Sequence, residues 1–195
     1  MTPGTEDGTS VGIRLLESAT GYALAAVEAV TPELLPCPTP CQGWDLRMLL
    51  RHACESLAAI HEGIDAGCID RYPSREDAGV AGDPARAFHD RAGRLLDACA
   101  TPSCQPEVIH IADALLARSV MAGAGALEIA VHGWDVSRAC GRCQPIPPEL
   151  AADLLAIAPL LVPGRDRHPL FAEPVSVPPE ADPSDRLAAF LGRSP

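Results

Sequence analysis

The sequence predicts an all-α protein, an antiparallel four-helix bundle with extra helices at its C-terminus. Hydrophobic residues make up 47% of the 195 residues but aromatic residues only 4%, so leucine, alanine, valine and isoleucine have to form the core. Several long segments carry these residues at helical spacing, with few β-branched alternations. The 20 prolines gather between the segments and towards both ends, where they separate helices.

The first half of the chain is expected to form three helices. The first covers residues 10–30 and is followed by a proline-rich connection, in which prolines two residues apart exclude a helix or a central strand. The second covers residues 44–66, with Asp45 in its first turn at the positive end of the helix dipole. The third covers residues 84–100, with Asp83 as its N-cap.

The second half is expected to hold one long helix followed by shorter elements. The long helix covers residues 107–139, with Gly123 and Gly125 as weak points at which it can split. The shorter elements are a helix over residues 148–161, an irregular proline-rich segment over 162–182 and a short helix over 183–191. A short edge strand at FAEPVSV, residues 171–177, is the one strand expected.

Residues 1–195 are expected to form one domain of ordinary size, with residues 1–9 disordered. The net charge of −11 argues against nucleic acids and anionic membranes as partners, because both need a basic surface. Neither a secretory signal nor a run of about 18 apolar residues without charges is found. We therefore expect a cytoplasmic protein.

The segment LEIAVHGWDV, residues 127–136, places a carboxylate and an imidazole four residues apart in a predicted helix. At about 100° per residue, Glu128 and His132 lie about 40° apart, so they can hold one ion from the same side. Asp135 falls within about 20° of Glu128. On spacing alone, a hydrogen-bonded surface pair is the more common arrangement. The apolar neighbours leave little polar surface, which favours a buried, paired site.

A third ligand has to come from another helix, and His52 is the best candidate because Leu49 and Leu50 precede it and Asp45 lies seven residues earlier on its face. The alternative is a histidine at the edge of the core that donates to a carbonyl, which is the more common case for a lone histidine. The remaining histidines fall in polar or loop contexts, or on another helix face, and are expected to be solvated: His61, His89, His110 and His168.

Eight cysteines are many for a cytoplasmic protein, and most are expected to be free thiols. Cys140 and Cys143 form a C-x-x-C sequence after the long helix, and Cys37 and Cys41 form a C-x3-C sequence. The two pairs are candidates for redox chemistry or for a second metal site. Inert or disulfide-prone thiols are the favoured interpretation, because the dipole at a helix C-terminus opposes a thiolate. Cys41 is also a candidate to lie near the first metal site, with a packed loop thiol as the alternative.

Three segments together resemble one known family: TPCQGWDLRMLLRHACE, LEIAVHGWDVSRACG and the ending DRLAAFLGRSP. They resemble the metal-binding domain of the mycothiol-dependent maleylpyruvate isomerase family, which belongs to the DinB-like superfamily of metal-binding four-helix bundles. The resemblance extends from about residue 10 to the end of the sequence. The isomerase proper carries a further C-terminal domain that supplies a catalytic arginine, for which this sequence has no room. Cys37, Cys140 and Cys143 also depart from the family pattern.

The resemblance implies a metal site with His52, Glu128 and His132 as its ligands. It implies a divalent metal, with zinc first and nickel, iron or cobalt as alternatives, and a low-molecular-weight thiol such as mycothiol. Two histidines and one carboxylate leave coordination positions open, so a bound ion can deprotonate a thiol or a water. Asp135 is a candidate to orient a ligand imidazole. Asp45 is a weaker one, for which helix capping is the favoured interpretation.

The resemblance therefore implies a metal-dependent transferase, isomerase or hydrolase that uses a thiol to attack small electrophilic molecules, with no catalytic base assigned. Arg138 and Arg193 are candidates to bind a carboxylate of the thiol cofactor, although surface arginines are the default interpretation. The alternative function is a non-catalytic metal or thiol-redox sensor that uses the cysteine pairs. The apolar face of the helix over residues 107–139 also raises the hypothesis of a homodimer.

Overall fold

The computed structural model describes residues 8–69, 82–101, 107–111, 114–162, 164, 167 and 171–195. Most of these residues are helical, as predicted. The four long helices are α1 (Gly8–Val27), α2 (Leu46–Ala66), α3 (Pro84–Ala100) and α4 (Arg118–Ala139). Two shorter helices follow near the C-terminus, α5 (Pro148–Leu161) and α6 (Pro183–Phe190).

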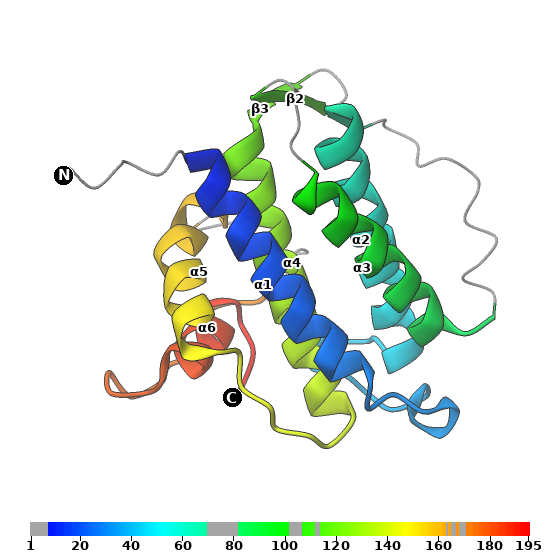
Figure 1. Cartoon of the computed structure of the whole chain (residues 1–195). Helices are drawn as coiled ribbons and strands as arrows, with labels where there is room; N and C mark the ends of the chain where they lie inside the picture. Colours follow the sequence, from blue (N-terminus) through cyan, green and yellow to red (C-terminus); the bar gives the residue numbers. More distant parts are fainter. Residues whose placement is uncertain are drawn as a thin grey trace.

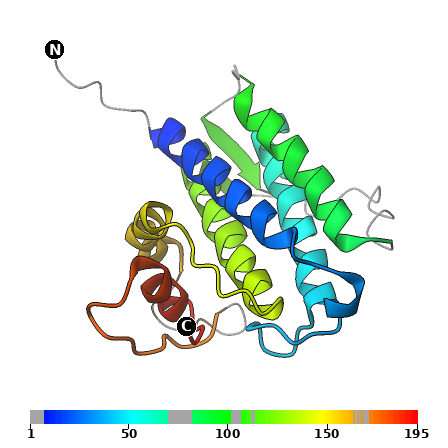
Figure 2. The ribbon, with the colours of Figure 1, turned by 60° about the horizontal axis from the view of Figure 1, so that its bottom comes forward.

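Helix α4 lies at the centre of this arrangement. It packs along α1 on one side and against α2 on another, while α2 also packs against α3 (Figure 1). Helix α5 packs against a further side of α4 and also against α6 (Figure 2). Sixteen of the 22 residues of α4 are buried, so the apolar face that suggested a dimer is packed within the chain.

Two glycines allow α1 and α4 to approach closely. A Cβ added at Gly12 would lie 2.9 Å from the carbonyl oxygen of Ser119, and one added at Gly133 would lie 2.9 Å from the Cα of Ala23. Both distances are shorter than a carbon atom tolerates. Since Gly133 directly follows His132, the same close contact fixes the part of α4 that carries the candidate site.

Residues 108–111 and 114–117 form strands, so the prediction of a helix over all of 107–139 was wrong at its start. Strand β2 (Val108–Ile111) pairs in parallel with β1 (Cys68–Ile69) and antiparallel with β3 (Ala114–Ala117). The β-branched side chains of β2 suit a strand, and Ile109 is completely buried. This small sheet lies at one end of the helices (Figure 1).

Helix α4 runs to Ala139 without a break, so the split considered at Gly123 and Gly125 does not occur. Both glycines face large neighbours. A Cβ at Gly125 would lie 3.0 Å from Ile60, and one at Gly123 would lie 3.2 Å from Ile157. The glycines therefore make room for α2 and α5 instead of interrupting the helix.

The bounds of four helices lie within two residues of the expected ones: α2, α3, α5 and α6. The side chain of Asp83 caps α3 by accepting from the N–H groups of Ala85 and Arg86. The proline-rich connection contains a short 3-10 turn, η1 (Pro32–Leu34), which was not expected. Helix α1 begins at Gly8, within the segment expected to be disordered, while residues 1–7 lie outside the described residues.

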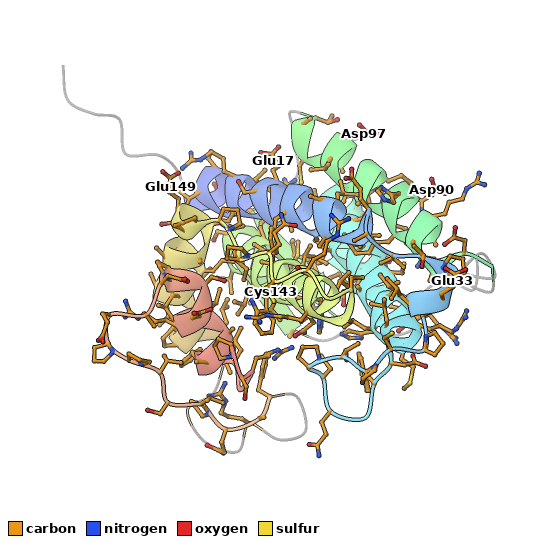
Figure 3. All side chains as sticks on the ribbon, turned by 90° about the horizontal axis from the view of Figure 1, so that it is seen from below. Glu17, Glu33, Asp90, Asp97, Cys143 and Glu149 are labelled. Carbon is orange, nitrogen blue, oxygen red and sulfur yellow. The ribbon has the colours of Figure 1, made fainter. Side chains whose placement is uncertain are left out.

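The described residues of the irregular segment 162–182 form neither a helix nor a strand, so FAEPVSV is not a strand. Its Val175 N–H donates to the carbonyl oxygen of Ala189. Carboxylates on α3 and α5, such as those of Asp90, Asp97 and Glu149, are exposed to solvent, in line with the negative net charge (Figure 3). None of the described helices combines the length and the apolar character needed to cross a membrane.

We expect Gly133→Ala to lower the free energy of unfolding by about 1–3 kcal/mol, because the added Cβ overlaps Ala23 on α1. Urea unfolding of the purified variant measures this. The matched control is Gly21→Ala within α1, where a Cβ meets nothing within 4 Å. That variant should gain about 0.5–1 kcal/mol, because alanine is the better helix former. Equal effects of the two substitutions would contradict the close packing of α1 on α4.

Candidate metal centre

Helices α2 and α4 bring together the three side chains that the sequence singled out. The Nε2 atom of His52 lies 2.8 Å from Oε1 of Glu128, and the Nε2 atom of His132 lies 3.2 Å from the same oxygen. One ligand atom from each residue lies within 4.8 Å of the other two. His52 comes from α2, while Glu128 and His132 are one turn apart on α4.

The packing of α2 on α4 holds these side chains in place. Leu49, Leu50 and Ala53 of α2 are buried, which turns the adjacent His52 towards the edge of the core. The Trp44 ring packs edge-on against the His52 ring, with 4.9 Å between centroids. The two histidine rings stand perpendicular to each other, 5.1 Å apart.

One side of the cluster is open to solvent. The side chains of His52 and Glu128 are 37% and 30% exposed, whereas that of His132 is 9% exposed. Ser56, one turn after His52, donates to Oε1 of Glu128 at 3.1 Å. Sequence reasoning missed Ser56, although its spacing of four residues from His52 on a helix was a usable signal.

The hydrogen bonds of the cluster decide its charge. Burial alone would raise the pKa of Glu128, but hydrogen bonds from His132 and His52 outweigh it and lower that pKa well below its usual value. Burial alone would lower the pKa of His132, but its bonds to Asp135, Cys41 and Glu128 outweigh burial and raise it. The side chains thus form an ionised carboxylate between two imidazoles, a set of groups that can exchange protons for a divalent cation.

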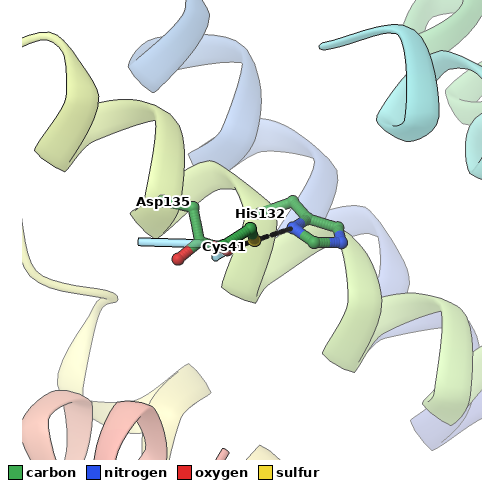
Figure 4. Close-up of side chains that lie close together, drawn as sticks. All are labelled: Cys41, His132 and Asp135. Atoms are coloured by element: carbon green, nitrogen blue, oxygen red, sulfur yellow. Dashed lines mark hydrogen bonds and ion pairs between the residues drawn. The ribbon is translucent and has the colours of Figure 1, made fainter. Parts of the chain in front are cut away.

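Asp135 lies close to His132 and Cys41 (Figure 4), and it contacts Nδ1 of His132, whereas Nε2 of that ring faces Glu128. Its Oδ2 atom is 3.1 Å from Nδ1 of His132, and the carboxylate is completely buried. An imidazole that donates from Nδ1 presents Nε2 towards Glu128 and His52. A carboxylate in this position can orient a metal-binding histidine, and this role of Asp135 stays a prediction.

Arg193, from the segment after α6, neutralises Asp135. Its Nη2 donates to Oδ2 at 2.8 Å and its Nε donates to Oδ1 at 3.3 Å. The interpretation of Arg193 as a surface residue was wrong, because its side chain is only 9% exposed and paired with Asp135. Sequence reasoning could not find this pair, since 58 residues separate its members.

Cys41 lies close to the candidate site, as one of its two interpretations expected. Its thiol donates to Oδ2 of Asp135 at 3.2 Å, and its Sγ lies 4.0 Å from Nδ1 of His132. Cys41, His132 and Asp135 therefore form a second group with the spacing of metal ligands. However, the Arg193 guanidinium lies 3.5 Å from Cys41 Sγ and opposes a cation there. His52, Glu128 and His132 are the better candidate.

Asp45 lies at the start of α2, and the capping interpretation is confirmed. Its Oδ1 accepts from the N–H of Met48 at 2.8 Å. Arg138 lies over the Trp134 ring at 4.6 Å and donates to the sulfur of Cys143 at 3.4 Å. The other described histidines, His61, His89 and His110, are exposed or half-buried. His168 lies outside the described residues.

The described cysteines are all free thiols. Cys140 ends α4 and Cys143 is exposed in the turn that follows (Figure 3). Burial and the nearby Cys37 raise the pKa of Cys140, which opposes a thiolate. The two cysteines of the C-x3-C sequence therefore have different neighbours. Cys37 influences Cys140, whereas Cys41 contacts Asp135. Cys104 lies outside the described residues.

Comparison with known proteins gives a consistent result. The model of the family described as mycothiol maleylpyruvate isomerase N-terminal domain matches residues 16–137. An uncharacterized protein of Mycobacterium tuberculosis, from strains CDC 1551 / Oshkosh and ATCC 25618 / H37Rv, is 31% identical over 175 residues. The aligned part covers 88% of this chain and 92% of that protein. No solved structure matches this chain.

We expect Arg193→Leu to lower the free energy of unfolding by about 3–5 kcal/mol, because it leaves the buried carboxylate of Asp135 without its cation. Urea unfolding of the metal-free protein measures this. Arg186→Leu, at an exposed position of α6, is the matched control and should change stability by less than about 0.5 kcal/mol. If both variants are as stable as the parent, Arg193 does not hold Asp135 in place.

Proposed function

We propose that this protein, since the chain belongs to the mycothiol maleylpyruvate isomerase N-terminal domain family, binds one divalent metal ion and uses it to activate a low-molecular-weight thiol. The proposed ligands are His52, Glu128 and His132. The observation that carries the proposal is the approach of two imidazole Nε2 atoms, one from each of two helices, to a single carboxylate oxygen. As a further part of this proposal, helices α1 to α4 form a DinB-like four-helix bundle.

The chemistry of the donor set supports the proposal. Catalytic zinc sites have three protein ligands from histidine and carboxylate side chains and keep a further position open. Two nitrogens, one oxygen and a partly exposed side match this description. Zinc is the first expectation, and the same donors also suit nickel, iron and cobalt.

The residues around the ligands have defined tasks in this proposal. Asp135 holds the proton of His132 on Nδ1, so that Nε2 is free to coordinate, and Arg193 keeps Asp135 ionised. Ser56 restricts the carboxylate of Glu128 to one orientation. An ion bound here supplies Lewis acidity, which converts a thiol into a nucleophile near neutral pH. The proposed reaction class is addition of the thiol to a small electrophilic molecule. In an S-transferase the thiol stays in the product, and in an isomerase the new C–S bond breaks again and releases the thiol.

The redox-sensor alternative has weaker support. Cys41 donates its thiol proton to Asp135, and the sulfur of Cys143 accepts from Arg138. In both contacts the thiol is bound to a residue other than the cysteine with which it was paired, Cys37 for Cys41 and Cys140 for Cys143. The elevated pKa of Cys140 also disfavours the thiolate on which rapid disulfide exchange depends.

We expect the purified protein to bind one zinc ion per chain. His52→Ala or Glu128→Gln should weaken zinc binding by more than about 100-fold. The loss of a residue that only orients a ligand weakens metal binding by up to about 100-fold. Competition with a chromogenic chelator measures the affinity. His89→Ala, at an exposed position of α3, is the control and should bind zinc like the parent. Parent-like affinity in both ligand variants would remove the proposed site.

A further inference from the structure

We propose that the pocket beside Glu128 binds the apolar group of the electrophilic substrate, so that this substrate is a small molecule with an alkyl or aryl group. This inference rests on the proposed metal-dependent function and adds the class of substrate to it. The pocket lies between α4 and the C-terminal part of the chain, where Figure 2 shows α5 and α6 beside α4.

The walls of the pocket are apolar on both sides. Helix α4 contributes Ala124, Leu127 and Val131, which share one face of the helix. Leu161, at the end of α5, and Phe171 and Leu191 form the opposite wall. Ala124, Leu161 and Phe171 are half-exposed, so the pocket is accessible from solvent.

Glu128 connects the pocket to the proposed metal centre. It is the one charged residue among the described lining residues, and the same carboxylate lies between His52 and His132. A molecule held at the ion therefore has its remaining atoms next to the apolar walls. Pockets with apolar walls and one convergent polar group are typical of small-molecule sites.

The volume and charge of the pocket define the group that fits. It measures about 160 Å³, and an apolar cavity of about 150 Å³ is large enough for benzene. Arg193 is paired with the buried Asp135, so its charge is not available for a substrate carboxylate. A phenyl group or an alkyl chain of about six carbons matches these walls better than a charged group.

A series of alkyl hydroxamates tests this inference, because the hydroxamate can bind zinc while the chain enters the pocket. Calorimetry on the zinc-loaded protein compares acetohydroxamate, butanohydroxamate and hexanohydroxamate. We expect the affinity to rise about fourfold per methylene until the pocket is full. A hexanohydroxamate analogue with a terminal carboxylate should bind much more weakly than hexanohydroxamate.

Ala124→Leu should fill the pocket and remove the dependence on chain length, while acetohydroxamate binds as in the parent protein. Ala139→Leu, also half-exposed on α4 but outside the pocket, is the matched control and should keep that dependence. In the metal-free parent, 1-hexanol should shift the methyl NMR signals of Leu127 and Val131, and Ala124→Leu should prevent this.

The two proposals fail in different ways. Equal affinity for all three hydroxamates, or tight binding of the analogue with a carboxylate, overturns the apolar pocket and leaves the metal centre standing. A protein that binds no zinc but whose Leu127 and Val131 signals respond to 1-hexanol contradicts the metal centre and supports the pocket.

Discussion

The imidazole of His132 connects the two ends of a charged network inside an apolar core. One ring nitrogen faces Glu128 and the other faces Asp135, which is completely buried and paired with Arg193. Buried charges are costly unless they are paired and hydrogen-bonded, so each member of this network requires its neighbours. The network also ties the end of the chain to α4, because Arg193 follows α6. The stability of the C-terminal part and the geometry of the candidate metal centre therefore have a common origin.

The network can form only because α4 is held on several sides. The close contact of Gly133 with Ala23 fixes α4 against α1, and the contact of Gly125 with Ile60 fixes it against α2. The second contact brings α2, and with it His52, within reach of Glu128. On its open side, α4 borders the apolar pocket. One helix thus carries one wall of the pocket, two of the three proposed ligands and the carboxylate that orients His132.

The sequence was sufficient to predict most of the helices and the convergence of His52, Glu128 and His132, because spacing on a helix is a local property and the family resemblance connects α2 with α4. It was not sufficient for β2 and β3, where the low strand propensity of Ala114–Ala117 is overcome by pairing with Val108–Ile111. Nor could it identify the partner of Asp135, because ion pairs between distant segments leave no periodic signal. Gly123 and Gly125 were misinterpreted for the same reason, since their neighbours belong to other helices.

X-ray absorption spectroscopy of the zinc-loaded protein is the most direct test of the metal centre. If His52, Glu128 and His132 coordinate zinc, the spectrum should show nitrogen and oxygen atoms at about 2.0–2.2 Å from zinc and no sulfur. A sulfur atom at about 2.3 Å would instead place the ion beside Cys41 and Asp135, on the other nitrogen of His132, and would contradict the proposed centre.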